Sequence, residues 1–440
     1  MLQSFRLTRN GGEGSGQWTK ISCRRLLQEP MRLTILVEAR GGLTNGLSAA
    51  SDWLAQFLRD ADLRDFLKSI KKKIIGINSE TVTNVTSTDF PGHWPGEDNS
   101  WSLDSFRNTF KINIHNNDPL DSSFSLVGID AAVANAFRRI MIAEIPSVAI
   151  EAVFVHNNTS VIQDEVLCQR LGLVPFQGGK EGIQEFLKWH PRKKDDGMNT
   201  VVEEEEEENT KFDYNTIILS LKITCTRNKE AERGERDPLK AYHNAHVYAR
   251  DIQFKPFGRQ EQYFSGEDAI RPTNPDILVA KLRPGQCIDI DMHAFKGVGS
   301  DHAKFSPVAT ASYRLLPTIT IMKPILGKDA EKFARCFPQG VIGLEKVTKK
   351  EAQRKGSGYE GHEGENKAVV VDPMKDTVSR ECLRHEEFEG KVKLGRIRDH
   401  FIFSVESVGQ WESDALFLES VKVLKMKCAA LKQNLQTMNR

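Results

Sequence analysis

The stretch that decides the fold runs from residue 124 to residue 176 and reads FSLVGIDAAVANAFRRIMIAEIPSVAIEAVFVHNNTSVIQDEVLCQRLGLVPF. It opens with a short apolar run, after which Asp130 offers a side chain that can cap the N-terminus of a helix. The residues from Ala131 to Glu144 are mostly helix formers. Pro146 ends the helix because the residue before a proline avoids the helical region. The pattern predicts a strand followed by a capped helix.

The predicted helix carries an apolar stripe with two arginines beside it. Four residues recur on one face at helical spacing, and they are Val133, Phe137, Ile140 and Glu144. Arg138 and Arg139 are adjacent in the middle of the helix. At least one of them must therefore flank the buried stripe rather than point straight into solvent.

The residues after this helix predict a second strand and a second helix. Ala149–Val155 is strand-like and ends at a polar turn over residues 156–158. The run from Val161 to Leu171 has Asp164 and Glu165 at its front, where acidic side chains suit a helix N-terminus. On periodicity alone, the whole stretch is a core helix with a hairpin in an α+β domain.

Composition describes a globular protein of two or three domains. The chain has 440 residues, of which 39% are hydrophobic, and its 61 basic and 60 acidic residues leave a net charge of +1. Nucleic-acid-binding proteins usually show a clear basic excess, so this balance argues against that class. The seven cysteines form no C-x-x-C pair, which favours free thiols in a reducing compartment. No apolar run approaches the ~20 residues that span a bilayer, so we expect no membrane segment.

Alternating apolar residues predict strands in the middle and later parts of the chain. Ile217–Cys225 and Cys287–His293 each place apolar side chains on one face, which predicts a β-rich insert. Two strands are expected over Ala309–Leu316 and Thr318–Met322, separated by Pro317. A further strand is expected around Phe401, Phe403 and Val405.

Polar segments interrupt this pattern. Residues 177–212 are charged and include six consecutive glutamates, Glu203–Glu208, which repel one another and predict a disordered loop. Residues 345–371 are rich in lysine, glycine and glutamate and predict a mobile loop. Near the N-terminus, an apolar stripe over residues 51–70 predicts a helix whose docking partner the sequence does not identify.

The last predicted element is a helix from Ser413 to Gln436 with a seam close to a coiled-coil repeat. The seam residues step by four and three, and they are Phe417, Val421, Leu424, Cys428, Leu431 and Leu435. Two interpretations stay open at this point. The helix either packs inside the chain's own core or faces another subunit.

No catalytic, cofactor-binding or metal site can be assembled from the sequence. The weak candidates are the pair His243 and His246, the pair Asp289 and Asp291, Gly297-Val298-Gly299, and Asp301-His302. The histidine pair lacks a third ligand, and strand alternation explains the two aspartates. The glycine pair lacks the third glycine and the helix that phosphate binding requires. An enzyme therefore stays the weaker alternative, as does a free-standing nucleic-acid-binding module.

A longer, gapped motif points elsewhere. It consists of Asn135-Ala136-Phe137-Arg138-Arg139, Ala149, Val153, Asn158, Thr159, Asp164-Glu165 and Arg170-Leu171. This motif resembles the signature of the α-like subunits of DNA-dependent RNA polymerases. Cys168 departs from the pattern, because that family usually has a smaller residue there.

The resemblance extends from about residue 75 to residue 433. Supporting stretches include VTNVTSTDFPG (82–92), NAHVYARD (244–251), DHAKFSPVATASYRLLP (301–317) and CFPQGVIG (336–343). They are similar to the larger α-like subunit shared by eukaryotic RNA polymerases I and III. Some α-like subunits hold a cysteine cluster that this chain lacks between Cys168 and Cys225. Its absence favours this subunit over its RNA polymerase II counterpart.

The resemblance implies an α+β fold with a divided dimerisation domain. That domain would combine residues 75–147 with residues 302–440, and a β-rich insert over residues 148–301 would interrupt it. Residues 1–74 lie outside the match, and their basic bias is only weakly typical of a transit peptide.

The resemblance also implies a function without chemistry of its own. The subunit would be a non-catalytic assembly platform of RNA polymerases I and III, supporting rRNA, 5S rRNA and tRNA transcription in the nucleus and nucleolus. It would pair with a smaller α-like subunit and anchor the second-largest subunit, reach DNA only through the complex, and need no cofactor and no membrane. The expected interface residues are Asn135, Phe137, Arg138 and Arg139 toward the second-largest subunit, and Phe417, Val421, Leu424, Cys428, Leu431 and Leu435 on the last helix.

Overall fold

A computed structural model describes residues 73–86, 89, 93–94, 98, 100–189, 211–232 and 235–438. These residues form two compact units, one made of residues 73–318 with 393–440 and the other of residues 319–392. The mixture of helices and sheets confirms the α+β class. The predicted helix over 51–70, most of the 1–74 extension and the Glu203–Glu208 run lie outside the described residues.

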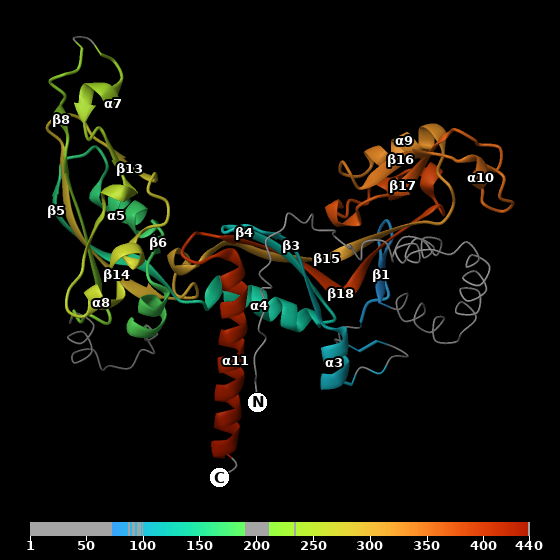
Figure 1. Ribbon diagram of the computed structural model, residues 1–440, viewed down its shortest axis with the longest axis horizontal. Helices are drawn as coiled ribbons and strands as arrows, with labels where there is room; N and C mark the ends of the chain where they lie inside the picture. The colour runs from blue at the N-terminus through green and yellow to red at the C-terminus, as the bar shows by residue number, and fades with distance from the viewer. Residues whose placement is uncertain are drawn as a thin grey trace, which may run out of the picture. The chain divides into compact units, whose positions relative to one another are not determined.

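A six-stranded sheet organises the larger unit (Figure 1). The strand order is β2-β1-β18-β4-β3, and β15 also pairs with β18. The strands are β1 (Ile74–Ile77), β2 (Val82–Thr83), β3 (Lys111–Asn117), β4 (Asp121–Val127), β15 (Val308–Ile321) and β18 (Val392–Ser407). β3 pairs antiparallel with β4, and Ile112 lies opposite Leu126.

β15 differs from the expectation of two strands broken at Pro317. It is one strand that runs from Val308 through Pro317 to Ile321. β15 pairs only with β18, so it is an edge strand. An edge strand tolerates proline because a missing N–H on its open side breaks no ladder bond.

Helix α4 (Ala131–Ala143) begins where the sequence predicts. The Asp130 side chain accepts a hydrogen bond from the Ala132 N–H at 2.7 Å, which confirms the cap. The predicted stripe is partly wrong, because Val133 is 40% exposed while Ala134, Ile140 and Met141 are buried. α4 packs against α11 (Ser413–Met438), and the exposed Val133 lies in the first turn of α4, whereas Ile140 and Met141 lie in its second half.

Aromatic rings fill the core between the sheet and these two helices. Phe403 is fully buried and stacks on Phe124 with ring centroids 5.4 Å apart. Tyr313 on β15 contacts Phe403 at the same centroid separation and meets Phe401 edge-on. The strand predicted around Phe401, Phe403 and Val405 is confirmed as part of β18, and all three side chains are buried. This cluster joins residues almost 300 positions apart into one core.

A second core lies under a four-stranded sheet with the order β11-β7-β14-β5. Its strands are β5 (Ser147–Asn158), β7 (Ile217–Thr224), β11 (Gln253–Lys255) and β14 (Cys287–Gly297). The predicted alternation is confirmed on β7 and β14, where Leu219, Leu221, Ile288 and Ile290 are all buried. The predicted turn over 156–158 is wrong, because β14 extends the ladder and pairs with β5 up to Asn158.

Short elements complete this unit. They are α3 (Leu103–Thr109), α5 (Asp164–Gly172), β6 (Phe176–Gln177), β8 (Thr226–Arg227), α7 (Pro238–Ala241), β9 (Tyr242–His243), β10 (His246–Tyr248), α8 (Gln260–Tyr263), β12 (Arg271–Pro272) and β13 (Leu278–Lys281). A single-turn π-helix, η3 (Gly182–Phe186), and short 3₁₀ turns join them.

The prediction of disorder from residue 177 onward is wrong for residues 177–189. Ile183 and Leu187 are buried in the second core. The Lys296 ammonium donates hydrogen bonds to the Leu187 carbonyl at 2.9 Å and to the Gln184 carbonyl at 2.8 Å. A Cβ on Gly182 would lie 2.4 Å from the Phe264 ring, so glycine permits this packing. Two apolar side chains and one distant lysine therefore order a segment that looks polar in sequence.

The smaller unit is a β-hairpin covered by a helix. It comprises α9 (Gly327–Arg335), β16 (Ile342–Lys346), α10 (Lys349–Ala352) and β17 (Asn366–Val370). The prediction of a loop over 345–371 is wrong at both ends, because β17 pairs along β16 and α10 follows directly. Thr348 and Glu351 cap α10 reciprocally. The sequence also gives no sign that residues 319–392 form a compact unit.

Glu351 makes the stability of this hairpin sensitive to acid. Its carboxylate accepts a hydrogen bond from Lys367 at 2.5 Å and bonds from Thr348, and the Lys367 bond lowers its pKa to about 2. Because this pKa lies below the unfolded value of 4.5, the stabilisation is complete above pH 4.5 and is lost as pH falls toward 2.

We expect Glu351→Gln to remove this acid-dependent component and to speed amide exchange over residues 366–370 at neutral pH. The loss should be about 1 kcal/mol at most, because the side chain is 37% exposed and solvent screens the pair. Hydrogen exchange of the full chain between pH 7 and pH 3 measures it. Glu389→Gln, at an exposed carboxylate of the same unit, is the control. An unchanged acid profile in Glu351→Gln would assign the acid sensitivity to another group.

Candidate subunit interface

Helices α4 and α11 cross within the larger unit, and α11 continues well beyond the crossing (Figure 1). The Lys427 ammonium pairs with both carboxylate oxygens of Glu144 at 2.8 and 2.9 Å. This pair joins α11 to the C-terminal end of α4. All described α11 residues after Lys427 are exposed.

The first half of the predicted α11 seam belongs to this chain's own core. The Phe417 ring lies 4.8 Å from Phe124 and meets the Phe137 ring edge-on at 5.2 Å. Leu424 is half-buried against the same core, and Val421 is 39% exposed at its margin. Phe137 and Phe417, both predicted as interface residues, are thus brought together inside the chain.

The second half of the seam has no cover from this chain. Leu431 is 62% exposed, Leu435 is 53% exposed, and Cys428 is exposed. Met438, 82% exposed, continues the same spacing one step past the residues that the sequence identified. We call Cys428, Leu431, Leu435 and Met438 the distal seam. A row of apolar side chains on one helix face is typical of an interface between helices.

On α4, a neighbouring side chain fixes the orientation of Arg138. The Arg138 guanidinium donates to the Asn135 side-chain carbonyl through Nε at 3.0 Å and Nη2 at 2.9 Å. Arg138 is half-buried and Arg139 is exposed, which confirms that one of the two flanks the buried face. The two bonds to Asn135 fix the orientation of the Arg138 guanidinium group and leave its other N–H groups available to a binding partner. Asn135 and Arg138 therefore form one hydrogen-bonded pair of side chains, and Arg139 is separate from this pair.

Other residues of the sequence motif hold the chain's own fold. Asn158 donates to the Asp164 carboxylate at 2.6 Å and so ties the end of β5 to α5. Arg170 on α5 donates to the Leu278 carbonyl at 2.7 Å and the Val279 carbonyl at 3.1 Å. These bonds satisfy backbone groups of β13, so this part of the motif has a structural explanation.

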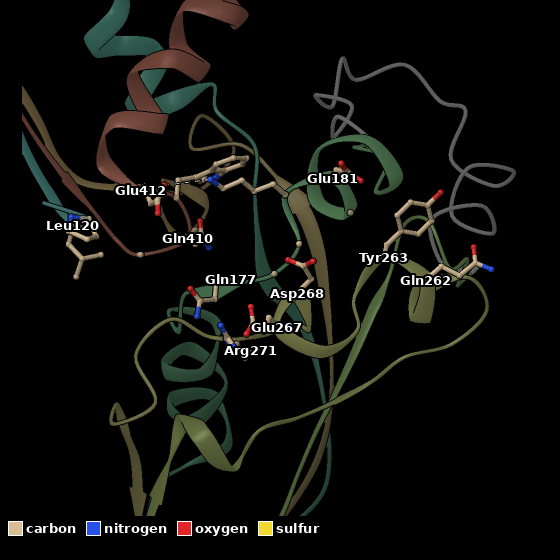
Figure 2. A pocket seen from close by; sticks show the side chains of 17 residues that line it. Leu120, Gln177, Glu181, Gln262, Tyr263, Glu267, Asp268, Arg271, Gln410 and Glu412 are labelled. Carbon is tan, nitrogen blue, oxygen red and sulfur yellow. Dashed lines mark ion pairs between the residues drawn. The ribbon is translucent and has the colours of Figure 1, made fainter. Parts of the chain in front are cut away.

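A polar cleft of about 680 Å³ lies in the larger unit, between the loop before β4, the segment around η3, the α8 region and the turn before α11. Figure 2 shows Gln177, Glu267, Asp268 and Arg271 grouped on one side of it. At another side, Lys180 pairs with Glu412 at 3.8 Å. The described lining residues include no serine, cysteine or histidine. The side chains of the cleft can donate and accept hydrogen bonds and can form charge pairs.

The weak candidates of the sequence have other partners. Asp289 pairs with Lys222 at 2.6 Å, and Asp291 bonds His156 at 3.0 Å, which holds the pKa of that carboxyl below its ordinary value. His246 bonds the Tyr248 hydroxyl at 3.2 Å. Within the described ranges, no group of three or more histidine, cysteine or acidic side chains is placed to hold a metal ion.

Two further observations concern the Cys382 thiol and the length of the helices. Burial raises the pKa of the Cys382 thiol to about 12, so this thiol is a poor nucleophile. Among the helices that the structure describes, none is long and apolar enough to cross a membrane.

Comparison with known proteins matches residues 123–428 to the RNA polymerase Rpb3/Rpb11 dimerisation domain. The chain is 50% identical over 360 residues to the DNA-directed RNA polymerases I and III subunit RPAC1 of Saccharomyces cerevisiae, covering 82% of this chain and 97% of the relative. It is 44% identical over 347 residues to the Homo sapiens protein of the same name, covering 79% and 90%. It is 28% identical over 311 residues to the RNA polymerase II subunit rpb3 of Dictyostelium discoideum, covering 69% and 87%.

These matches span both the strand–helix stretch around α4 and most of α11. A polymerase subunit with a dimerisation domain implies a complex with other polymerase subunits. The higher identity to the subunits named for polymerases I and III confirms the resemblance seen in the sequence. The chain therefore belongs to the α-like subunit family of DNA-dependent RNA polymerases, in the branch of subunits named as shared by RNA polymerases I and III.

Proposed function

We propose that this chain is a non-catalytic assembly subunit of RNA polymerases I and III, which acts in rRNA, 5S rRNA and tRNA transcription in the nucleus and nucleolus. The observation that carries the proposal is the distal seam, an apolar row on α11 that no described part of the chain covers. Covering such a row removes apolar surface from water, which stabilises association. The dimerisation domain found by comparison ends at residue 428, within α11.

The partner proposed for the distal seam is the smaller α-like subunit. The domain of this chain that would bind the smaller subunit combines residues 75–147 and 302–440, and residues 148–301 form the insert. Two separate hydrophobic cores support this division, one around Phe403 and one around Leu221. The seam steps by three and four residues, as helices that pack side by side require.

The partner proposed for α4 is the second-largest subunit. Asn135, Arg138 and Arg139 present donors there, and Phe137 supports α4 from inside through Phe417. A guanidinium fixed by Asn135 can pair with a carboxylate or carbonyl at little further entropic cost. The two partners thus meet different helices, so their contacts can be separated by substitution.

Arg138→Ala tests this assignment. We expect the variant to keep the smaller α-like subunit and to lose retention of the second-largest subunit by about thirtyfold or more, since truncating one member of a hydrogen-bonded charge contact costs about 2 kcal/mol or more. The measurement is purification through a C-terminal tag, with quantification of the co-purified chains by mass spectrometry. Arg227→Ala, at an exposed arginine of β8, is the matched control and should retain both partners.

Equal loss of both partners from Arg138→Ala would indicate misfolding and contradict the assignment. Recovery of polymerase II subunits alone with the unaltered chain would contradict the choice of polymerases I and III. Purification of the unaltered chain as a lone monomer would contradict the assembly function itself.

A further inference from the structure

The hairpin of the smaller unit has one open edge. β17 has neighbours on both sides, because it pairs with β16 and also with Leu326, and the Ala368 N–H donates to the Ile325 carbonyl at 3.1 Å. β16 pairs only with β17. β16 is therefore the outer strand of this small sheet.

The register fixes which backbone groups of β16 face outward. Val371 donates to the Val341 carbonyl at 2.8 Å and Val347 donates to the Glu365 carbonyl at 2.9 Å, so bonded pairs begin and end the ladder. Bonded and non-bonded pairs alternate between antiparallel strands. Gly343 and Glu345 consequently face β17, whereas Ile342, Leu344 and Lys346 direct their N–H and C=O groups away from it. None of these six groups has a hydrogen-bond partner within the described part of the chain.

A cavity of about 410 Å³ lies beside this edge. It is lined by α9, by the turn that follows it and by β16, through Glu331, Ala334, Arg335, Phe337, Pro338, Gln339, Gly340, Ile342 and Leu344. Leu344 is 44% exposed at its mouth. α9 packs on both strands of the hairpin and also lines the space next to the outer strand. The arrangement is a helix-covered sheet with room for one more strand.

The charges around the edge favour an acidic occupant. Arg335 lines the cavity, Lys346 ends β16, and Lys350 follows in α10. All three are exposed, and the ion pairs of the described residues nearby involve Lys332, Lys349 and Lys367 instead. Glu331 is the one acidic residue in the lining. A segment that carries carboxylates would therefore gain charge pairs here.

We propose that β16 binds an extended, acidic segment of another protein chain in the assembled polymerase as an additional strand. The main-chain groups of Ile342, Leu344 and Lys346 would pair with that segment. An apolar side chain of the segment would enter the cavity, and its carboxylates would lie against Arg335, Lys346 and Lys350. The alternative is that Lys346 guards an edge that stays open to water.

Hydrogen exchange at single-residue resolution tests the proposal on the full chain and on the assembled polymerase. Strand addition is expected to slow exchange of the Ile342, Leu344 and Lys346 amides at least tenfold in the assembly. Gly343 and Glu345 should be protected in both samples, because their amides bond to β17. Unchanged exchange at the three outward amides would overturn the proposal and favour the alternative, in which the edge stays open to water.

Substitutions sharpen this test. Leu344→Pro removes the outward N–H without breaking a bond to β17, and Lys346→Glu reverses the charge. Each is expected to abolish the tenfold protection, whereas Leu344→Val, which keeps the N–H, should retain it. Protection that survives both changes would overturn the proposal. Thermal unfolding of each variant chain checks that the unit remains folded.

Zero-length coupling of amines to carboxylates identifies the occupant, since it joins the Lys346 amine to a contacting carboxylate with loss of water. An adduct with an acidic segment of another chain supports the proposal. Adducts only with this chain's own residues, such as Glu203–Glu208, would overturn it. This inference rests on the proposed assembly function, and its protection and coupling tests use the assembled complex. A recovered complex with an unprotected edge would therefore refute this inference and leave the proposed assembly function intact.

Discussion

Replacing Leu431 and Leu435 together by aspartate is expected to abolish pairing with the smaller α-like subunit, with a loss of affinity of at least about 100-fold. The change removes two apolar side chains from the proposed contact and would place two unpaired carboxylates in it. Each effect makes the free energy of binding less favourable by about 1 kcal/mol or more. The isolated chain should unfold at an unchanged temperature, because both side chains are exposed and lie beyond the Lys427–Glu144 pair. Titration of the smaller subunit and thermal unfolding of the variant measure the two effects.

Met426→Asp is the matched control for this experiment. Met426 has the same exposed fraction as Leu431, 62%, but lies off the distal seam on the same helix. Binding should therefore persist in this variant. If Met426→Asp weakens pairing as much as the double variant does, the contact is not confined to the seam. A drop in the unfolding temperature of the double variant would instead place the seam residues within the chain's own core.

Phe403→Ala is expected to lower the free energy of unfolding of the larger unit by about 3–5 kcal/mol. The Phe403 ring is fully buried and contacts Phe124 and Tyr313, so its removal leaves a cavity that these neighbours can fill only in part. Because Phe124 also contacts Phe417, the base of α11 loses support. Denaturant unfolding of the full chain measures the change.

Phe154→Ala provides the comparison. Phe154 lies on β5 and is 46% exposed, so its truncation should cost less than about 1 kcal/mol. Equal effects of the two substitutions would contradict the assignment of Phe403 to the centre of the core. The Phe403→Ala chain should also lose both polymerase partners together, in contrast to the selective loss expected from Arg138→Ala.

Local chemistry determined much of this protein from the sequence alone. Asp130 caps α4 because a short carboxylate can accept from the second N–H of a helix, whatever the helix packs against. The alternation on β7 and β14 predicted their buried faces because side chains alternate along any strand. The spacing of the distal seam and the gapped polymerase motif were likewise readable along the chain.

For other residues, only the tertiary structure decided whether they are ordered, paired or buried. Lys296 orders residues 184–187 from more than a hundred positions away, and the edge position of β15 lets Pro317 stay within a strand. The same spacing on α11 placed Phe417 in the chain's own core and left Leu431 exposed, because α4 and the sheet reach only the first half of that helix. Helical spacing specifies a face, but only the contacts of the folded chain specify what covers it.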